Sequence, residues 1–461
     1  MQINFSLCLN FVAVFGCILT GSAGSLAQDV VPPPGFIPGQ ETDSTPGPTS
    51  PPSFLKNHDS WRRPEANQGQ PDYFPDASDA YRPYEPVQTY APPAVPVLFG
   101  PDVTPLPRFW LRAEALYWWT KDSPLPVPIV TQGNPADAIP GALGQPGTSV
   151  LIGDQDVSFG GRGGGRFAFG FSLDAEQAWG FEGSYFFLAN ESVVQGVSSD
   201  GGPGSALLAF PFFDPTLPGE NSTFIASPGS FAGNAELTVT QFLQGLDLNL
   251  IHNIHNLNGV RVDVLGGFRW VNLQEDLSFI TDSPSVAPNP PDFFHTFDRF
   301  NANNNFYGGQ LGLRASYDNT RLFLNAIGKV ALGSTIERVS VNGGTFTDAG
   351  AFASAPGAYL SQLTNLGTAS QGHFAVVPEV NLNFGVRLTP WASVVVGYSF
   401  LYVSSVVRPG DQIDRIINPT QAPAITGNFG GTLSGPARPA LLLRDSDFWA
   451  QGLNFGLQFR Y

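Results

Sequence analysis

The sequence predicts an all-β protein, an up-and-down antiparallel transmembrane β-barrel of about ten strands behind a disordered, proline-rich N-terminal leader. Three observations support this prediction. Apolar and polar residues alternate with period two over segments of about 9 to 13 residues. Aromatic residues gather at the ends of these segments, and short connections alternate with long ones. Twelve strands are the alternative, if one long loop folds into another hairpin.

The composition excludes several other classes of protein. Only 13% of the residues are charged, against about 25% in a typical soluble domain. A net charge of -16 argues against nucleic acid as a partner, because that polyanion needs a basic face. Beyond the N-terminus there is no apolar run of 18 or more residues, so a bundle of membrane helices is not expected.

Residues 1–27 are expected to be a secretory signal peptide. They carry no charge, centre on an apolar stretch from Phe11 to Leu19, and end in a small-x-small pattern at Ala27. Both cysteines, Cys8 and Cys17, lie in this segment, so cleavage would leave a chain without disulfides. A loose lipoprotein box around Cys17 is the competing interpretation. In either case the sequence predicts export.

Residues 28–107 are expected to form a disordered periplasmic leader. They hold nearly half of the 42 prolines, and proline at this density removes backbone donors and blocks helix formation. Aromatic residues such as Tyr73 and Tyr81 recur here beside a basic pair, Arg62 and Arg63. The segment is therefore either a plain spacer or a tether to cell-wall material.

From Phe109 to the C-terminus the chain is expected to be the barrel, 108–461. In the first strand the outward face runs from Phe109 to Trp119, whereas the opposite face carries Arg112 and Glu114. The ten strand windows are 109–119, 167–173, 179–187, 242–250, 260–270, 307–317, 322–332, 380–388, 394–402 and 453–461. The aromatic residues that we assign to interfacial girdles are Tyr117, Trp119, Tyr185, Trp270, Tyr317, Trp391, Tyr402 and Trp449.

The connections between the windows alternate strictly in length. Long loops are expected at 121–160, 190–235, 273–305, 335–374 and 405–447, and short turns at Asp174–Gln177, Asn253–Asn258, Asp318–Asn319 and Thr389–Pro390. Outer-membrane barrels have short periplasmic turns and long outer loops. The pattern therefore predicts a bacterial outer-membrane location with both termini in the periplasm.

The last strand alternates apolar and polar residues and stops on an aromatic residue. Its outward residues are Leu453, Phe455, Leu457, Phe459 and Tyr461. Such an ending resembles the signal by which the outer-membrane barrel-assembly machinery recognises its substrates. Outer-membrane lipid and this machinery are therefore the expected partners.

Several unusual blocks occur in a fixed order along the barrel. They are WLRAEALYWW (110–119), GGFRWVNLQEDL (266–277), NFYGGQLG (305–312), VPEV (377–380), GYSFLY (397–402) and RPGDQID (408–414). Together they resemble the planctomycete family-seven outer-membrane β-barrel proteins, a porin-type group, over residues 108–461. The resemblance implies an outer-membrane barrel behind a proline-rich leader and implies no reaction.

The candidate functional residues are charges that the strand phase turns into the lumen. They are Arg112, Glu114, Arg166, Asp174, Glu182, Asp247, Arg261, Asp263, Arg269, Arg314, Lys329, Glu379 and Arg387. A basic residue facing lipid at mid-membrane would cost about 2 to 4 kcal/mol, which fixes this phase. These charges either line an ion-selective pore or pair across a narrow lumen and plug it.

No motif predicts catalytic, cofactor-binding or metal-binding residues. His373 near loop carboxylates is the one arrangement that looks like an enzyme site, and no spacing supports it. His252 and His255 lack further ligands, and Asp411 and Asp414 lack the oxygen density of a calcium loop. The glycines of 160–165 are followed by a strand and not by a helix, so they do not predict a nucleotide loop.

We therefore expect an integral outer-membrane barrel with a structural or porin-like role, passing small solutes if the lumen is open. The chain is expected not to be an enzyme and to need no cofactor. The alternative is a surface adhesin or receptor that acts through the long outer loops.

Overall fold

The computed structural model describes residues 108–286, 293–348 and 352–461. The predictions made for residues 1–107 lie outside the described residues. The barrel strands are β1 (Phe109–Thr120), β4 (Gly161–Ser172), β5 (Trp179–Ser199), β8 (Gly233–Leu257), β9 (Val260–Pro284), β10 (Phe293–Asp318), β11 (Leu322–Thr347), β13 (Gly367–Arg387), β14 (Ala392–Val407) and β15 (Asp445–Arg460). Each predicted strand window falls within, or overlaps, one of them.

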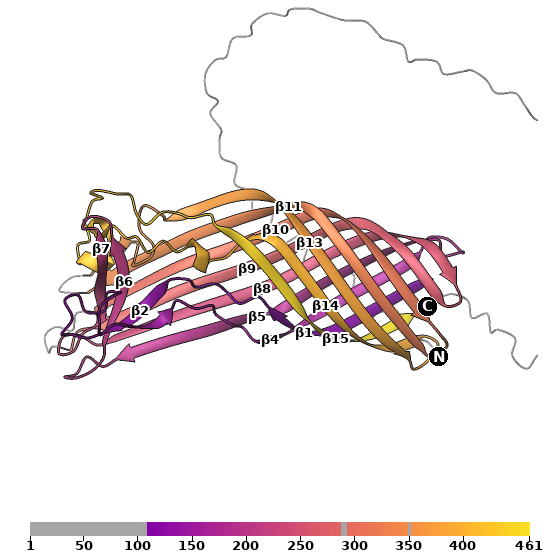
Figure 1. The fold of residues 1–461 in the computed structure, drawn as a ribbon, viewed down its shortest axis with the longest axis horizontal. Coiled ribbons are helices and arrows are strands. Elements are labelled where there is room, and N and C mark those ends of the chain that lie inside the picture. The colour runs from indigo at the N-terminus through magenta and orange to yellow at the C-terminus, as the bar shows by residue number, and fades with distance from the viewer. Residues whose placement is uncertain (1–107, 287–292, 349–351) are drawn as a thin grey trace, which may run out of the picture. The chain divides into compact units, whose positions relative to one another are not determined.

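These ten strands form one closed antiparallel ring, which confirms the predicted fold class. Each strand pairs with its neighbour along the chain, and β1 pairs with β15 to close the ring, with Trp110 opposite Arg460. Within the apolar band, closure leaves no strand edge unpaired, as a structure in lipid requires. Figure 1 shows the strands tilted and side by side. We call the end with the short connections and the C-terminus the turn end, and the opposite end the loop end.

The outer surface of the barrel carries an apolar band next to the turn end. On β1 it runs from Phe109 to Trp119, and on β10 from Tyr307 to Tyr317, with the outward side chains exposed. Ten residues at about 3.3 Å each, tilted by about 40°, span roughly 25 Å, which is the height of an apolar band in lipid. The predicted outward residues of the last strand, Leu453, Phe455, Leu457 and Phe459, belong to this band.

The strands continue well beyond the apolar band, and here the prediction of loops at 273–305 and 335–374 is wrong. Strands β8 to β11 are 25 or 26 residues long. Beyond the band the polarity of the wall reverses. On β9 the outward residues from Asn272 to Ser278 are polar, whereas Leu277 and Phe279 point inward and are buried. Apolar and polar residues still alternate beyond the band, but the apolar residues now point inward. A strand prediction that follows outward apolar residues therefore stops at the edge of the band.

The turn between β8 and β9 also differs from the prediction. Residues of the expected turn Asn253–Asn258 belong to β8 as far as Leu257. The hairpin is closed by Asn258 and Gly259, whose φ angles are +54° and +77°. Two successive positive φ angles are typical of a type I′ turn, which favours Asn-Gly.

A second sheet stands at the loop end. It has the order β3-β2-β6-β7, formed by β2 (Pro128–Gly133), β3 (Ser149–Gly153), β6 (Leu207–Asp214) and β7 (Gly219–Ala226). A long loop thus does fold into a further hairpin, β6–β7, but the hairpin joins this sheet and the ring keeps ten strands. A short strand, β12 (Ala353–Pro356), pairs with β11.

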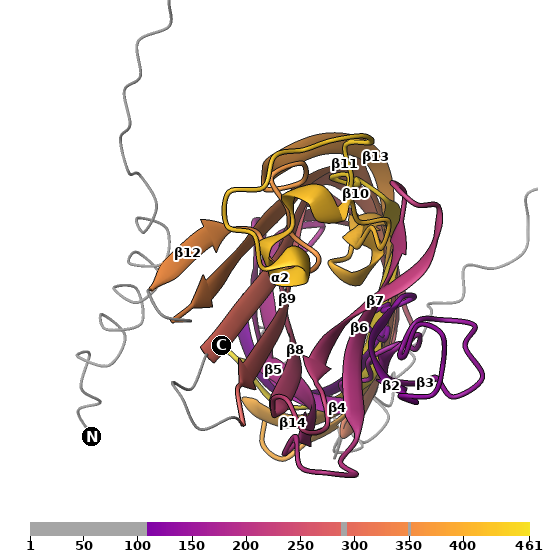
Figure 2. The same cartoon turned by 90° about the vertical axis from the view of Figure 1, so that its left-hand side faces the viewer.

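The connection from β14 to β15 folds into the mouth of the barrel. It contains η1 (Gly410–Gln412), η2 (Pro419–Gln421) and α2 (Pro423–Thr426), and Figure 2 shows α2 over the loop end. Ile413, Ile417 and Ala424 are buried in an apolar core together with residues of the second sheet. The expectation that 405–447 is a surface loop is therefore wrong, because its apolar residues fill the mouth. None of the described helices is long and apolar enough to cross a membrane.

Candidate functional site

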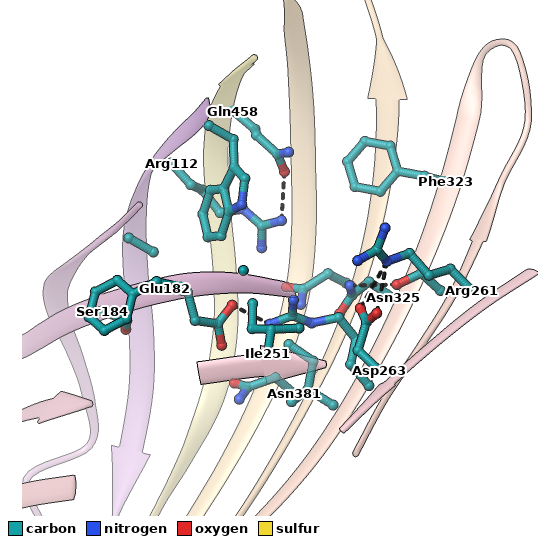
Figure 3. A pocket seen from close by; sticks show the side chains of 18 of the residues that line it. Arg112, Glu182, Ser184, Ile251, Arg261, Asp263, Phe323, Asn325, Asn381 and Gln458 are labelled. Carbon is teal, nitrogen blue, oxygen red and sulfur yellow. Dashed lines mark hydrogen bonds and ion pairs between the residues drawn. The ribbon is translucent and has the colours of Figure 1, made fainter. Parts of the chain in front are cut away.

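A cavity of about 440 Å³ occupies the lumen within the apolar band. Its wall comes from inward side chains of strands around the ring, several of which are labelled in Figure 3. Ten of the thirteen charges that the strand phase predicts for the lumen line this cavity: Arg112, Glu114, Arg166, Glu182, Asp247, Arg261, Asp263, Arg314, Lys329 and Glu379.

The structure places the other three predicted charges elsewhere. Arg269 is buried in the wall and forms an ion pair with Glu379. Arg387 lies at the turn-end rim and forms an ion pair with Asp318. Asp174 lies in the β4–β5 turn, where its carboxylate accepts hydrogen bonds at 2.7 Å from the backbone of Ala178 and Trp179. It lies beyond the last residue of β4, so the strand alternation no longer sets its direction.

The deepest part of the charge network surrounds Glu379. This carboxylate pairs with Arg269 and, at 3.3 Å, with Lys329. Lys329 also contacts Asp247 at 3.1 Å. All four side chains are buried, although they come from β8, β9, β11 and β13. Charges on distant segments are therefore neutralised across the lumen, as burial of an ion requires.

Further pairs extend the network around the cavity. Arg314 pairs with Glu182, whose other oxygen accepts a hydrogen bond from Asn249 at 3.2 Å. Arg166 lies 3.3 Å from Glu114. The remaining cations are held in the same way, with Arg112 donating to Gln458 at 2.6 Å and Arg261 contacting Asp263 at 2.8 Å. Figure 3 shows the last two of these contacts.

The charges that line the cavity balance. Its cations are Arg112, Arg166, Arg261, Arg314, Lys329 and Arg460, and its anions are Glu114, Glu182, Asp247, Asp263, Asp318 and Glu379, six of each. An ion-selective passage uses an excess of one sign of charge. The balance favours mutual pairing over ion selection.

A layer of apolar side chains fills the lumen on the loop side of this cavity. It includes Leu116, Trp118, Phe186, Leu243 and Phe306, all of which are buried. Side chains that point into a ten-stranded barrel have little free cross-section to leave open. The layer therefore separates the charged cavity from the loop end.

Beyond the apolar layer lies a second polar cluster, which the sequence did not predict. Arg408 forms an ion pair with Glu275, and both side chains are fully buried. Glu275 also accepts a hydrogen bond at 2.7 Å from Gln241, which in turn binds Arg162. Glu275 and Arg408 both lie in segments for which the sequence predicts long loops. The signal that could have revealed Glu275 is its place between Leu273 and Leu277 at period two.

A second inserted segment is held by Asp298 of β10. Its carboxylate accepts hydrogen bonds from the backbone N–H groups of Tyr359 at 3.2 Å, Leu360 at 3.1 Å and Ser361 at 2.7 Å. Burial raises the pKa of Asp298 to about 6, although these hydrogen bonds act in the opposite direction. Asp298 thus ties the connection between β12 and β13 to the barrel wall.

The other sequence motifs form no site in the described parts of the chain. No group of three or more metal-ligating side chains occurs there. The ring of His252 packs against Trp179, and His373 lies 3.3 Å from Asp445. Asp414 accepts hydrogen bonds from its own connection, including one from Ala440 at 2.8 Å. The glycines of 160–165 lead into and form the start of β4.

The comparisons with known proteins agree with this architecture. A family model described as "Putative beta barrel porin-7 (BBP7)" matches residues 110–461. No curated protein matches the chain.

Three solved structures match over most of their own length, at low sequence identity and low TM-score. The outer membrane protease OmpT from Escherichia coli is 12% identical, with 78% of this chain and 98% of that chain covered and a TM-score of 0.34. A Pseudomonas aeruginosa FadL homologue is 9% identical (77% and 90% covered, TM-score 0.20). The P. putida toluene transporter TodX is also 9% identical (79% and 92% covered, TM-score 0.18).

The match to OmpT corrects one prediction. The expectation that the chain is not an enzyme is wrong as stated, because a protease is among the solved proteins that it matches. The ion pairs inside the lumen also do not tell whether side chains at the rim of the barrel are catalytic. At this level of similarity the match assigns no proteolytic activity to the chain.

Proposed function

The chain belongs to the beta barrel porin-7 family and lies in the outer membrane, and from this premise we propose that it is a porin-type envelope barrel held closed in the state described. Its role in this state is structural. Solutes pass only when the connection between β14 and β15 leaves the mouth.

The observation that carries this proposal is the ion pair between Arg408 and Glu275. It joins the inserted connection to the wall of β9, and both side chains are fully buried. The backbone N–H and C=O of Val407 also bond to the Asn304 side chain of β10, at 2.7 and 2.9 Å. Loss of one partner by mutation would leave a buried charge unpaired, which would destabilise the closed state by about 3 to 5 kcal/mol.

Conductance in planar bilayers tests the closed state. We expect the purified full chain to be silent, or to open rarely, and Glu275→Ala to raise the open fraction at least tenfold, because it leaves Arg408 unpaired in the mouth. The control is Glu220→Ala, which breaks a half-exposed pair with Arg415 in the same connection. Steady conductance of the unchanged protein, or equal effects of the two variants, would count against the proposal.

We propose further that the turn end faces the periplasm and the loop end faces outward. The short connections at one end and the long ones at the other support this orientation. A membrane-impermeant maleimide on intact cells should label Leu217→Cys, an exposed site in the β6–β7 hairpin, and should not label Glu176→Cys in the β4–β5 turn. Labelling in the reverse order would overturn the orientation.

A surface receptor is the second candidate, and one observation favours it. The four strands β3-β2-β6-β7 form a separate sheet at the loop end, joined to the barrel core through Phe210, Phe212 and Ile225. A packed sheet presents a more fixed surface than free loops do. Deletion of residues 215–218 at the tip of the β6–β7 hairpin should abolish any cell-surface binding and leave the barrel folded.

A further inference from the structure

Just beyond the apolar band, the outer wall of β9, β10, β11 and β13 carries two adjoining hollows. Their volumes are about 420 and 490 Å³, and Asn303 and Arg338 line both of them. Their other side chains that can hydrogen-bond are mostly uncharged, such as Thr368 and Ser370. The two hollows form one polar surface centred on Arg338.

The hollows are positive although the chain is strongly acidic. Arg338 is the one charged residue that lines the larger hollow. The smaller hollow adds Arg299 and Asp276, which lie 3.6 Å apart, so its net charge is also +1. Among the described residues, the exposed guanidinium of Arg338 has no hydrogen-bond or ion-pair partner. In a protein of net charge -16, this surface is complementary to an anion.

The neutral side chains around Arg338 are already fixed. Asn272 donates to Asn303 at 2.9 Å and to Asn305 at 3.1 Å, and Asn305 donates to Asn303 at 2.8 Å. Both contacts to Asn303 use its amide oxygen, so its N–H₂ group remains able to donate to a ligand. Ordered amides of this kind bind hydroxyl groups without a large entropy cost.

The height of the surface narrows the class of ligand. On β10 the apolar band ends at Tyr307, four residues from Asn303, which lies opposite Arg338; on β11 it ends at Ile336, two residues from Arg338. Two to four residues of a tilted strand rise roughly 5 to 10 Å. A phospholipid headgroup layer extends only about 5 to 8 Å beyond the hydrocarbon. Arg338 therefore lies at the outer edge of such a layer, where its guanidinium group can contact a phosphate that is carried on a sugar ring.

We propose that this surface binds the phosphorylated sugar headgroup of an outer-leaflet glycolipid. Arg338 contacts the phosphate, and Asn303 with the Thr368 and Ser370 hydroxyl groups contacts the sugar. As a cell-surface role the assignment rests on the proposed orientation of the barrel. Binding of the glycolipid in detergent does not depend on how the barrel is oriented in the membrane. A wrong orientation and a wrong ligand assignment therefore give different experimental results.

Native mass spectrometry of the full chain in detergent tests the proposal. The probes are a phosphorylated glucosamine disaccharide lipid, the same lipid without phosphate, and phosphatidylglycerol. We expect the phosphorylated glycolipid to bind best, and Arg338→Gln to weaken it about tenfold, the effect of one charge-assisted contact. The control is Arg321→Gln, which removes an exposed arginine at the turn end.

Three outcomes would overturn the assignment. These are unchanged binding by Arg338→Gln, equal binding of the dephosphorylated lipid, and equal binding of phosphatidylglycerol. Asn303→Leu provides a second variant, expected to weaken the glycolipid and not phosphatidylglycerol. Because the Arg338 side chain is exposed and unpaired, its variant should fold, which heat-modifiable gel migration checks.

Discussion

Glu379 shows how a single residue holds a charge inside a membrane barrel. One carboxylate oxygen contacts Arg269 and Lys329, and the other accepts a hydrogen bond from Asn381 at 2.6 Å. The three partners come from three strands, so the ionised form is compensated from several sides. Neutralising this one residue leaves two buried cations without their shared anion.

Glu379→Gln should therefore lower the free energy of unfolding by about 3 to 5 kcal/mol. Urea titration of the detergent-solubilised barrel, followed by gel migration, measures the loss. The matched control is Asp276→Asn, whose partner Arg299 is exposed, and it should cost less than about 1 kcal/mol. Equal losses for the two variants would mean that the lumen network is solvated and weak.

Asp298 predicts a dependence on pH at the loop end. Burial raises its pKa from 3.8 to about 6, so the docked state binds a proton more tightly than the undocked state does. The stability that this group contributes is fully present below about pH 3.8 and is lost as the pH rises through about 6. At 1.36 kcal/mol for each pKa unit, the loss amounts to about 3 kcal/mol.

Hydrogen exchange of the segment 357–366 measures this effect. Its protection factors, corrected for the intrinsic pH dependence of exchange, should fall between pH 4 and pH 7. Asp298→Asn should flatten the curve, because an amide does not titrate, whereas Asp276→Asn should leave it unchanged. Protection factors that rise between pH 4 and pH 7 would contradict the prediction, because they would show that the ionised carboxylate holds the segment better than the protonated one.

The long strands are the elements whose ends are hardest to predict from the sequence, because the polarity of their two faces reverses at the edge of the apolar band. On β9 the outward face is apolar from Val260 to Trp270 and, except for Ile280, polar from Asn272 to Asp282, while the inward face changes in the opposite sense. Lipid surrounds the first part and water the second, so the same strand serves as a membrane span and as the wall of an ordinary apolar core.

The change of surroundings along β9 can be tested with two arginine substitutions on its outward face. Phe268→Arg places a charge in the apolar band and should cost about 2 to 4 kcal/mol, whereas Ser278→Arg lies beyond the band and should cost almost nothing. Unfolding of both variants from lipid vesicles measures the difference. Similar costs at the two positions would contradict the height assigned to the band.

At the scale of the whole molecule, closure of the ring and closure of the lumen have different origins. The ring closes through backbone pairing of β1 with β15. Three layers of side chains and backbone block the lumen in succession. They are the balanced charges around the cavity, the apolar layer that includes Leu116 and Trp118, and the inserted connection held by Arg408. Opening a passage requires movement of side chains and of the connection, and leaves the ring intact.

Local sequence patterns are enough to predict the number of ring strands, their phase within the band and the end at which the short turns lie. These properties follow from local alternation, because every residue that faces lipid within the apolar band is subject to the same requirement to be apolar. The Asn258-Gly259 turn was equally local and could have been recognised. Ten of the thirteen charges predicted for the lumen line the cavity, whereas Arg269, Arg387 and Asp174 lie outside it.

The pairing of the charges, the length of the strands beyond the band and the filling of the mouth depend on contacts between distant parts of the chain. Glu275 and Arg408 are far apart in the chain, and neither has a local pattern that points to the other. Beyond the band, outward and inward residues obey the rule of a water-soluble protein, so alternation alone does not say which face is which. Pairing across a lumen depends on distances between strands, and those are set only when the ring has closed.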